Sequence, residues 1–160
     1  MLIKIVDDDQ VFVKKIKDIV YDNFKDIFLD YSIECITSNF EAQYFEKGDI
    51  FFLDIDLKEK NGIKIAEEIR ENNSNAIIIF VSAMNDMIFD SLIVQPFYFI
   101  RKDNFDRDMK IACTLIQKYI NKNHKIITFD FNGKKTAIQL SDIIYLESFL
   151  HEITIHTSSN

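Results

Sequence analysis

The stretch Ile50-Phe51-Phe52-Leu53-Asp54 places four consecutive apolar residues directly before a carboxylate. An apolar run of this length is typical of a parallel strand that is buried on both faces. Residues 58–62, which read Lys-Glu-Lys-Asn-Gly, predict a loop and a turn after it. In open α/β sheets, ligands bind at the carboxyl ends of the strands. Asp54 is therefore either a cap for the next helix or a reactive group.

The composition is that of an ordered globular protein. The chain has 160 residues, which is enough for one full domain and part of a second. Of these residues 48% are hydrophobic, which is enough for a sizeable core, and only 3 are Gly and 1 is Pro. Cys35 and Cys113 lack metal-ligand spacing, so we expect two buried, reduced thiols. No apolar run has transmembrane length and the N-terminus turns acidic early, which predicts a cytoplasmic protein without a membrane partner.

The charge is acidic in both parts of the chain. Residues 1–123 hold 16 Lys and Arg against 22 Asp and Glu, and residues 124–160 hold 3 against 4. Nucleic-acid binding usually depends on a basic excess. Bulk electrostatics therefore supplies no DNA affinity.

Strand-like and helix-like patterns alternate up to about residue 121. Apolar or alternating runs predict strands at 2–6, 31–37, 50–53, 76–81 and 97–100, the second of them at a sheet edge. Helical spacing predicts helices around 12–24, 63–72, 84–92 and 105–120, and Asn39 is expected to cap a further short helix that ends near Gly48. Five successive β-α units imply a doubly wound α/β fold with a parallel sheet and helices on both faces.

The pattern changes at Lys125. Residues 126–140 contain the turn pair Asn132-Gly133 between two strand-like runs, which is a strong β-hairpin signal. Two more strand-like runs follow at 143–146 and 151–157. A few strands without a covering layer are rarely stable alone. We therefore expect a short all-β segment that begins a second domain, with the junction at 121–124.

Polar groups follow the predicted central strands where each one ends. These groups are Asp7 and Asp8, then Asp54, Ser82 and Lys102. A parallel sheet brings such ends into one crevice, where three carboxylates need a cation, and an all-oxygen site suits Mg²⁺. A lysine and a hydroxyl opposite them could hold the oxygens of a transferring phosphoryl group. The implied nucleophile is Asp54, whereas Asp9 is expected to cap the first helix.

Residues 1–121 resemble the receiver domain of two-component response regulators. Asp7 and Asp8 match the metal-binding acidic pair of that family, and Asp54 matches its phosphorylated aspartate. Asp56 falls where the family binds metal through a backbone carbonyl, and Gly62 where it has a glycine. The resemblance implies a flavodoxin-like, five-stranded parallel sheet with strand order 2-1-3-4-5, and a Mg²⁺ cofactor.

Four later residues match the same pattern. Ser82 matches the switch hydroxyl, and Ala83 matches the small residue that admits the phosphoryl group. Lys102 matches the phosphate-contacting lysine, and Phe99 matches the switch aromatic. In this order on these strands the motifs are specific.

The sequence departs from the receiver pattern at two positions. Lys58 and Asp103 both stand where the family usually has proline, and the second proline is normally joined to the lysine by a cis peptide. Because that peptide helps to aim the lysine, a trans bond would leave Lys102 less restrained. Arg101 is the alternative occupant of the lysine role.

The tail resembles the beginning of a LytTR-type DNA-binding domain. The resemblance rests on the Asn-Gly hairpin, residues 142–148 and the pattern 151–157, and it covers about a third of such a domain. It implies a receiver at 1–121, a linker at 122–124 and an incomplete β domain at 125–160. His151 lies near the position from which the family contacts bases, and it is equally explained as an ordinary loop histidine.

The two resemblances imply a response regulator. Asp54 would accept a phosphoryl group from a sensor histidine kinase, phosphorylation would promote homodimerisation, and the complete C-terminal domain would bind DNA to control transcription. Enzymatic activity would be limited to the protein's own phosphorylation and dephosphorylation.

Two alternatives use the same residues. A haloacid-dehalogenase-like phosphatase would use Asp54 as nucleophile and Asp56 as general acid/base, but that family has its DxD on the first strand. A pseudo-receiver would never be phosphorylated and would act as a dimerisation module. The presence of all the expected site residues argues against this alternative, namely Asp8, Asp54, Ser82 and Lys102.

Overall fold

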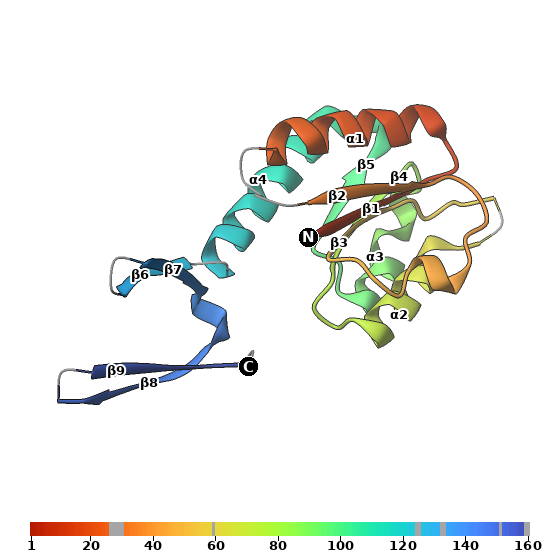
Figure 1. The fold of residues 1–160 in the computed structure, drawn as a ribbon. Helices are drawn as coiled ribbons and strands as arrows, with labels where there is room; N and C mark the ends of the chain where they lie inside the picture. The colour runs from red at the N-terminus through yellow and green to blue at the C-terminus, as the bar shows by residue number, and fades with distance from the viewer. Residues whose placement is uncertain (26–30, 59, 124–125, 132–133, 151, 159–160) are drawn as a thin grey trace. The chain divides into compact units, whose positions relative to one another are not determined.

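The sheet of the first part of the chain consists of five parallel strands. In the computed structural model, which describes residues 1–25, 31–58, 60–123, 126–131, 134–150 and 152–158, their order is β2-β1-β3-β4-β5 (Figure 1). The strands are β1 (Leu2–Val6), β2 (Ser32–Ile36), β3 (Ile50–Leu53), β4 (Ile77–Ser82) and β5 (Tyr98–Arg101). The predicted sheet, its order and the edge position of the second strand are confirmed.

The register of the strands aligns their carboxyl ends. Val6 pairs with Leu53, Leu53 pairs with Phe80, and Ser82 pairs with Arg101. Side chains that follow these positions therefore emerge at the same edge of the sheet.

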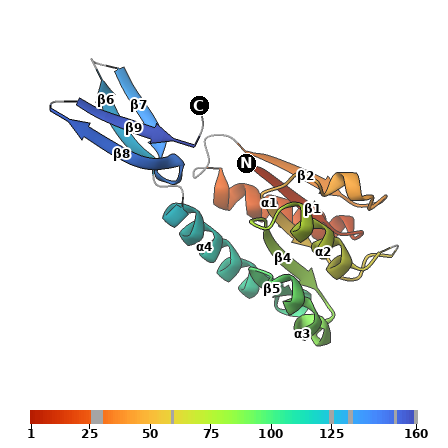
Figure 2. The same ribbon diagram turned by 90° about the horizontal axis from the view of Figure 1, so that it is seen from below.

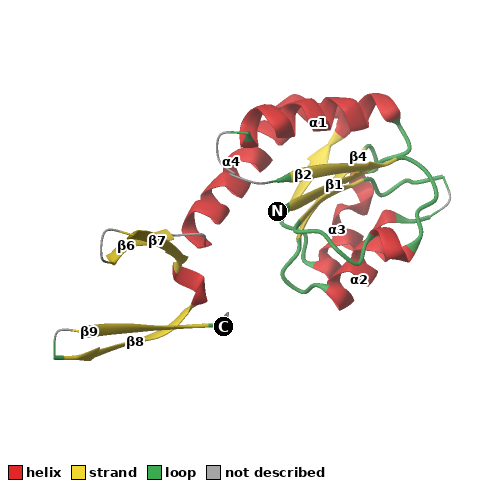
Figure 3. Ribbon diagram, in the orientation of Figure 1, coloured by secondary structure: helices red, strands yellow, loops and turns green. Residues whose placement is uncertain are grey.

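Helices cover both faces of this sheet. Helix α1 (Gln10–Phe24) lies on one face, and α2 (Gly62–Asn72) and the short α3 (Ile88–Ser91) lie on the other (Figure 3). Helix α4 (Phe105–Asn123) begins on the α1 face, where Asp106 forms an ion pair with Lys15 of α1 at 2.8 Å. None of the helices in the described ranges is both long and apolar enough to cross a bilayer.

Helix caps and apolar stripes explain where the helices begin and what they bury. The Asp9 side chain accepts a hydrogen bond from the Val11 N–H, which confirms the predicted cap of α1, and Asn61 caps α2 in the same way. Alternate strand residues pack against α2 in one core cluster, which includes Val6, Leu53, Phe80, Ala66 and Ile69. Strands β3 and β4 are buried along their whole length, as their apolar runs predict.

The predicted helix after β2 is wrong. The chain forms only one 3₁₀ turn there, η1 (Ala42–Tyr44), and Asn39 has a φ of 53°, which is not the extended conformation of an N-cap. Phe40 and Phe45 are buried, whereas residues 41–44 between them are exposed, so no helical apolar stripe exists. The buried Lys4 of β1 donates a hydrogen bond to the Tyr44 carbonyl and pairs with Glu34 at 3.2 Å, which anchors this crossing.

The predicted helix at 84–92 is largely replaced by 3₁₀ turns. Turns η2 (Asn85–Met87) and η3 (Leu92–Val94) flank the four-residue α3, and Gln95 ends the segment with a φ of 49°. Phe89 and Ile93 are 81% and 71% exposed, so tertiary packing covers only one side of this segment. Short segments of this kind gain little from helix propensity alone.

The expectation of two buried cysteines holds for one of them. Cys113 is buried, and burial raises its pKa to about 11. Cys35 is exposed, because β2 is the outermost strand and its side chains lack a neighbouring strand on one flank.

The C-terminal part of the chain is all-β, as predicted. The chain divides into two compact units, Met1–Cys113 and Thr114–Asn160, and the second holds two antiparallel pairs (Figure 2). One pair is β6 (Ile126–Phe131) with β7 (Lys134–Gln139); after the turn η5 (Leu140–Asp142), the other is β8 (Ile143–Phe149) with β9 (Glu152–Thr157).

Several sequence predictions fall partly or wholly outside the described residues. The Asn132-Gly133 turn and His151 are among them. Helix α4 extends to Asn123, so the first two residues of the predicted linker 122–124 are helical, and His124 lies outside the described residues. The division into 1–121, 122–124 and 125–160 stays a prediction.

Candidate functional site

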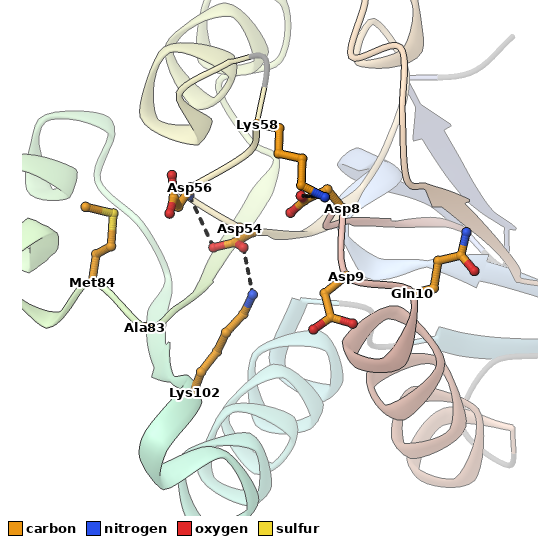
Figure 4. Close-up of a pocket in the computed structure, with 9 residues that line it drawn as sticks. All are labelled: Asp8, Asp9, Gln10, Asp54, Asp56, Lys58, Ala83, Met84 and Lys102. Atoms are coloured by element: carbon orange, nitrogen blue, oxygen red, sulfur yellow. Dashed lines mark hydrogen bonds and ion pairs between the residues drawn. The ribbon is translucent and has the colours of Figure 1, made fainter.

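The carboxyl edge of the sheet gathers three carboxylates. Oxygens of Asp7, Asp8 and Asp54 all lie within 4.8 Å of one another, with Asp7 and Asp54 buried and Asp8 half-buried. Asp8 and Asp54 line a cavity of about 530 Å³, together with Asp56 and Lys58, whereas Asp7 lies behind its lining (Figure 4). The backbone of Asp54 is fixed by a 2.8 Å hydrogen bond from its N–H to the Val6 carbonyl.

Lys102 neutralises the inner side of this cluster. Its Nζ donates a hydrogen bond to Asp54 Oδ2 at 2.7 Å and forms an ion pair with Asp7 Oδ2 at 2.8 Å. The same ammonium lies 4.7 Å from the centre of the Phe12 ring. Burial alone would lower the pKa of Lys102, but the two carboxylates outweigh it and the pKa is raised. Lys102 therefore stays protonated.

Arg101 is directed away from the cluster. Its guanidinium forms hydrogen bonds of 2.7 and 3.0 Å with the buried carboxylate of Asp108 on α4. The structure thus brings Lys102, and not the alternative Arg101, to Asp54.

Asp7 is the deepest acid of the cluster. Burial raises its pKa, and the bonds from Lys102 and the Asp9 backbone N–H oppose this shift. Its Oδ1 accepts the Asp9 N–H at 2.8 Å. A carboxylate held in this way is stabilised by a nearby cation.

The loop after Asp54 is held close to the strand end. The Asp56 N–H donates to Asp54 Oδ1 at 3.3 Å, while the Asp56 side chain is exposed. The Gly62 N–H donates to the Ile55 carbonyl at 2.8 Å, and a Cβ at Gly62 would lie 1.9 Å from the Asp54 carbonyl oxygen. Only glycine fits there, because any side chain would collide with the backbone of Asp54.

The predicted switch residues Ser82 and Phe99 lie on the neighbouring strands β4 and β5. Ser82 is fully buried at the end of β4, and its Oγ accepts the Met84 N–H at 3.1 Å, which ties the hydroxyl to the following loop. Ala83 and Met84 line the cavity. Phe99 is half-buried with its ring 6.2 Å from that of Phe80.

Sequence reasoning missed three contacts. Lys58 Nζ lies 3.0 Å from Asp8 Oδ2, and this bond raises the pKa of Lys58. The ring of Phe12 lies beneath the Lys102 ammonium, although its spacing indicated only a core position. Asp103 follows Lys102 through a trans peptide and accepts a hydrogen bond from Asn85 Nδ2 at 3.3 Å, which joins the loops after β4 and β5.

The donor set of the cavity fits a hard divalent cation. Mg²⁺ takes oxygen ligands and keeps several waters, so it suits a carboxylate cluster that is open on one side. Here three carboxylates lie together, and two of them, Asp8 and Asp54, line a cavity that has further polar groups.

The fold and the site define a flavodoxin-like α/β protein with an acidic cavity at the carboxyl edge of its sheet. The family model of the response regulator receiver domain matches residues 3–115, well over half of the chain. The chain therefore belongs to the response regulator receiver domain family, the class of two-component response regulators, and this membership favours neither alternative function.

Curated relatives extend the similarity beyond the receiver. The chain is 28% identical to the sensory transduction protein LytT of Bacillus subtilis, over 71% of this chain and 47% of that protein. It is 24% identical to LytT of Bacillus cereus, over 98% of this chain and 70% of that protein. The chain thus spans about half the length of the Bacillus subtilis relative.

Solved structures confirm the fold. The response regulator protein TrrA of Thermotoga maritima, crystallised in complex with Mg²⁺-BeF, is 25% identical with a TM-score of 0.57, over 71% of this chain and 97% of that one. A CheY-like response regulator receiver domain protein of Methanospirillum hungatei is 21% identical with a TM-score of 0.61, over 76% and 96%.

Proposed function

We propose that Asp54 is the phosphoacceptor of this response regulator and takes its phosphoryl group from a sensor histidine kinase. The observation that carries the proposal is the contact of one ammonium, that of Lys102, with both Asp54 and Asp7, beside Asp8 and an open cavity. A buried carboxylate at the end of a central strand, with a cation fixed beside it, is a nucleophile in a preorganised electrostatic site.

The residues of the site divide the work of phosphoryl transfer. An Asp54 oxygen forms the new bond to phosphorus, while the donor group leaves with the electron pair of the broken bond. Lys102 would exchange part of its contact with Asp54 for a phosphoryl oxygen, and Ala83 leaves room for that group. After transfer, Ser82 would turn from the Met84 N–H toward the phosphoryl group, and Phe99 would follow it inward.

Asp7, Asp8, Asp54 and the backbone carbonyl of Asp56 would hold Mg²⁺. When bound, this ion neutralises charge on the transferring phosphoryl oxygens. The three carboxylates supply the negative charge that the ion needs, which supports assigning the acidic pair to metal binding.

The wider function follows from the family and the relatives. Phosphorylation would promote homodimerisation, and DNA binding would require the complete C-terminal domain, which the similarity to the LytT proteins supports. The protein would act in the cytoplasm, and its only chemistry would be its own phosphorylation and dephosphorylation.

A small phosphodonor tests the central step. Incubation of the full chain with acetyl phosphate and Mg²⁺ should add one phosphoryl group by intact mass, whereas Asp54→Asn should stay unmodified. Asp8→Ala should react far more slowly because a metal ligand is lost. Asp56→Asn, which keeps the backbone carbonyl, is the matched control and should react like the wild type.

Two results would overturn the assignment. Label that persists on Asp54→Asn would identify another nucleophile. Sustained hydrolysis of a phosphomonoester that depends on the Asp56 side chain would favour the phosphatase instead.

A further inference from the structure

Lys58 reaches the acidic cluster from the side opposite Lys102. Its Nζ lies 3.0 Å from Asp8 Oδ2, and the two lysines approach the carboxylates from different loops (Figure 4). The side chain of Lys58 is 83% exposed, whereas that of Asp8 is 18% exposed. The neighbouring Leu57 is buried and fixes the base of the loop, so the ammonium of Lys58 can move while its backbone stays in place.

The two lysines differ in how firmly they are held. Lys102 contacts two buried carboxylates and a ring, and its side chain is only 14% exposed. Within the part of the chain that the structure describes, Lys58 has a single ion pair, on the solvent side of the cluster. Of the two cations, Lys58 is the one that can leave when another cation enters.

The charge balance of the site determines what it costs to replace Lys58 by a metal ion. Within the cluster, three carboxylates are opposed by two ammonium groups, and Asp9 and Asp56 add further carboxylates at the cavity. Negative charge therefore exceeds positive charge at the site. A divalent ion that binds Asp8 must share its carboxylate with the ammonium of Lys58 or displace it, because both need the same oxygens and repel each other. The cost of displacement adds to the free energy of metal binding.

We propose that Lys58 is a tethered cation that competes with Mg²⁺ for Asp8 and thereby raises the Mg²⁺ concentration at which the site fills. The inference rests on the proposed Mg²⁺ site and adds a residue that sets its affinity. It assigns Lys58 a role before phosphoryl transfer, while the cavity is still filling.

Calorimetric titration of the full chain with MgCl₂ alone tests the competition. Lys58→Met keeps the length of the side chain but removes its charge, and it should lower the Kd for Mg²⁺ by about two- to five-fold, the range that exposed ion pairs contribute to an equilibrium constant. Lys58→Arg keeps the charge and should bind Mg²⁺ like the wild type.

Lys60→Met is the matched control. Lys60 is an exposed lysine of the same loop, and its substitution removes the same charge from the loop while Lys58 keeps its contact with Asp8. It should change the Kd by less than Lys58→Met does. Amide NMR shifts of Asp8 and Asp54 during the same titration give a second readout at the site itself.

The outcomes separate this inference from the proposed function. The competition would be overturned, and the metal site left intact, if Lys58→Met bound Mg²⁺ with the same Kd as the wild type or Lys60→Met. A Kd for Lys58→Met that is higher than both would overturn it as well. Mg²⁺ binding that is absent from the wild type, or unaffected by Asp8→Ala, would overturn the metal site and the competition together.

Discussion

Lys102 is restrained by contacts that the sequence does not reveal. The sequence suggested a loosely held lysine, because Asp103 replaces the usual proline, yet two carboxylates and the ring of Phe12 hold the ammonium. A cation over an aromatic face is stabilised by the ring quadrupole. The orientation of the Lys102 side chain is thus set by the carboxylates and the ring that contact its ammonium group.

Removal of this lysine should destabilise the free protein. Lys102→Met leaves Asp7 and Asp54 buried without their cation, and we expect a loss of about 1–3 kcal/mol in the free energy of unfolding. This lies below the full cost of an orphaned buried charge because Asp54 lines a cavity that is open to solvent. Mg²⁺ should restore part of the loss. Urea unfolding with and without Mg²⁺ measures both, and equal stability of variant and wild type without Mg²⁺ would contradict the expectation.

The acids and Lys102 could be predicted because strand ends in a parallel sheet share one edge. Asp8, Asp54 and Lys102 follow apolar runs, and the register of the strands brings the ends of these runs to the same edge. The contacts of Lys58 and Phe12 depend on the path of a loop and the rotation of a helix, which no local pattern encodes. At position 62, by contrast, the glycine marks a close approach of two backbone segments in the sequence itself.

At the scale of elements, one corner joins β5 to α4. Arg101 at the end of the strand donates to Asp108 in the first turn of the helix through its side chain and through its backbone N–H at 3.2 Å. The guanidinium of Arg101 lowers the pKa of the Asp108 carboxyl, which is buried. The corner places Lys102, the next residue, at the cavity.

The corner should make stability depend on pH in the acidic range. Because the pKa of Asp108 is lower in the folded state, its contribution is complete above the unfolded value of about 4 and is lost as the pH falls through the folded value. Asp108→Asn should therefore cost about 1–2 kcal/mol near neutral pH, since Arg101 is partly exposed, and this difference should shrink below about pH 4.

Thermal melts of both proteins over a pH series measure that difference. Asp106→Asn is the control, because its ion pair with Lys15 is exposed and should contribute less than about 0.5 kcal/mol. A cost for Asp108→Asn that stays constant down to pH 3 would contradict the assigned pKa direction.

Long apolar runs made the strands predictable, whereas two connecting elements were not. Between Phe40 and Phe45 the exposed residues carry no apolar stripe, yet turn formers at both ends suggested a helix. Segment 84–92 has apolar residues at helical spacing, but Phe89 stays exposed, so burial does not support a full helix. Such short elements depend on tertiary contacts that sequence periodicity does not contain.

At the scale of the whole molecule, neither residues 1–123 nor residues 124–160 carry a basic excess in sequence. Residues 124–160 carry 3 Lys and Arg against 4 Asp and Glu, and the strands β8 and β9 expose large apolar residues such as Phe149 and Ile153. A reading surface for DNA commonly uses several basic contacts to phosphates. These β-strands supply few basic side chains for such contacts.

The 160-residue chain should therefore not bind DNA specifically. Fluorescence anisotropy against labelled duplexes at two salt concentrations should show only weak binding without sequence preference. A longer chain with the complete C-terminal domain should bind, and there His151→Ala should reduce specificity more than non-specific affinity. Sub-micromolar, sequence-selective binding by the 160-residue chain would show that the predicted domain boundary is misplaced.

The crossing between β2 and β3 has a consequence for how this fold can vary in length. Phe40, Phe45 and the Tyr44 carbonyl bound by Lys4 are separate anchors, and residues 41–44 between the two rings are exposed. One residue inserted into a helix would turn its apolar stripe by about 100°. A crossing that is fixed at separate points has no stripe to turn, so added residues can bulge into solvent. Residues 41–44 are therefore a place where an insertion or a fluorescent label should leave the carboxyl edge of the sheet in place.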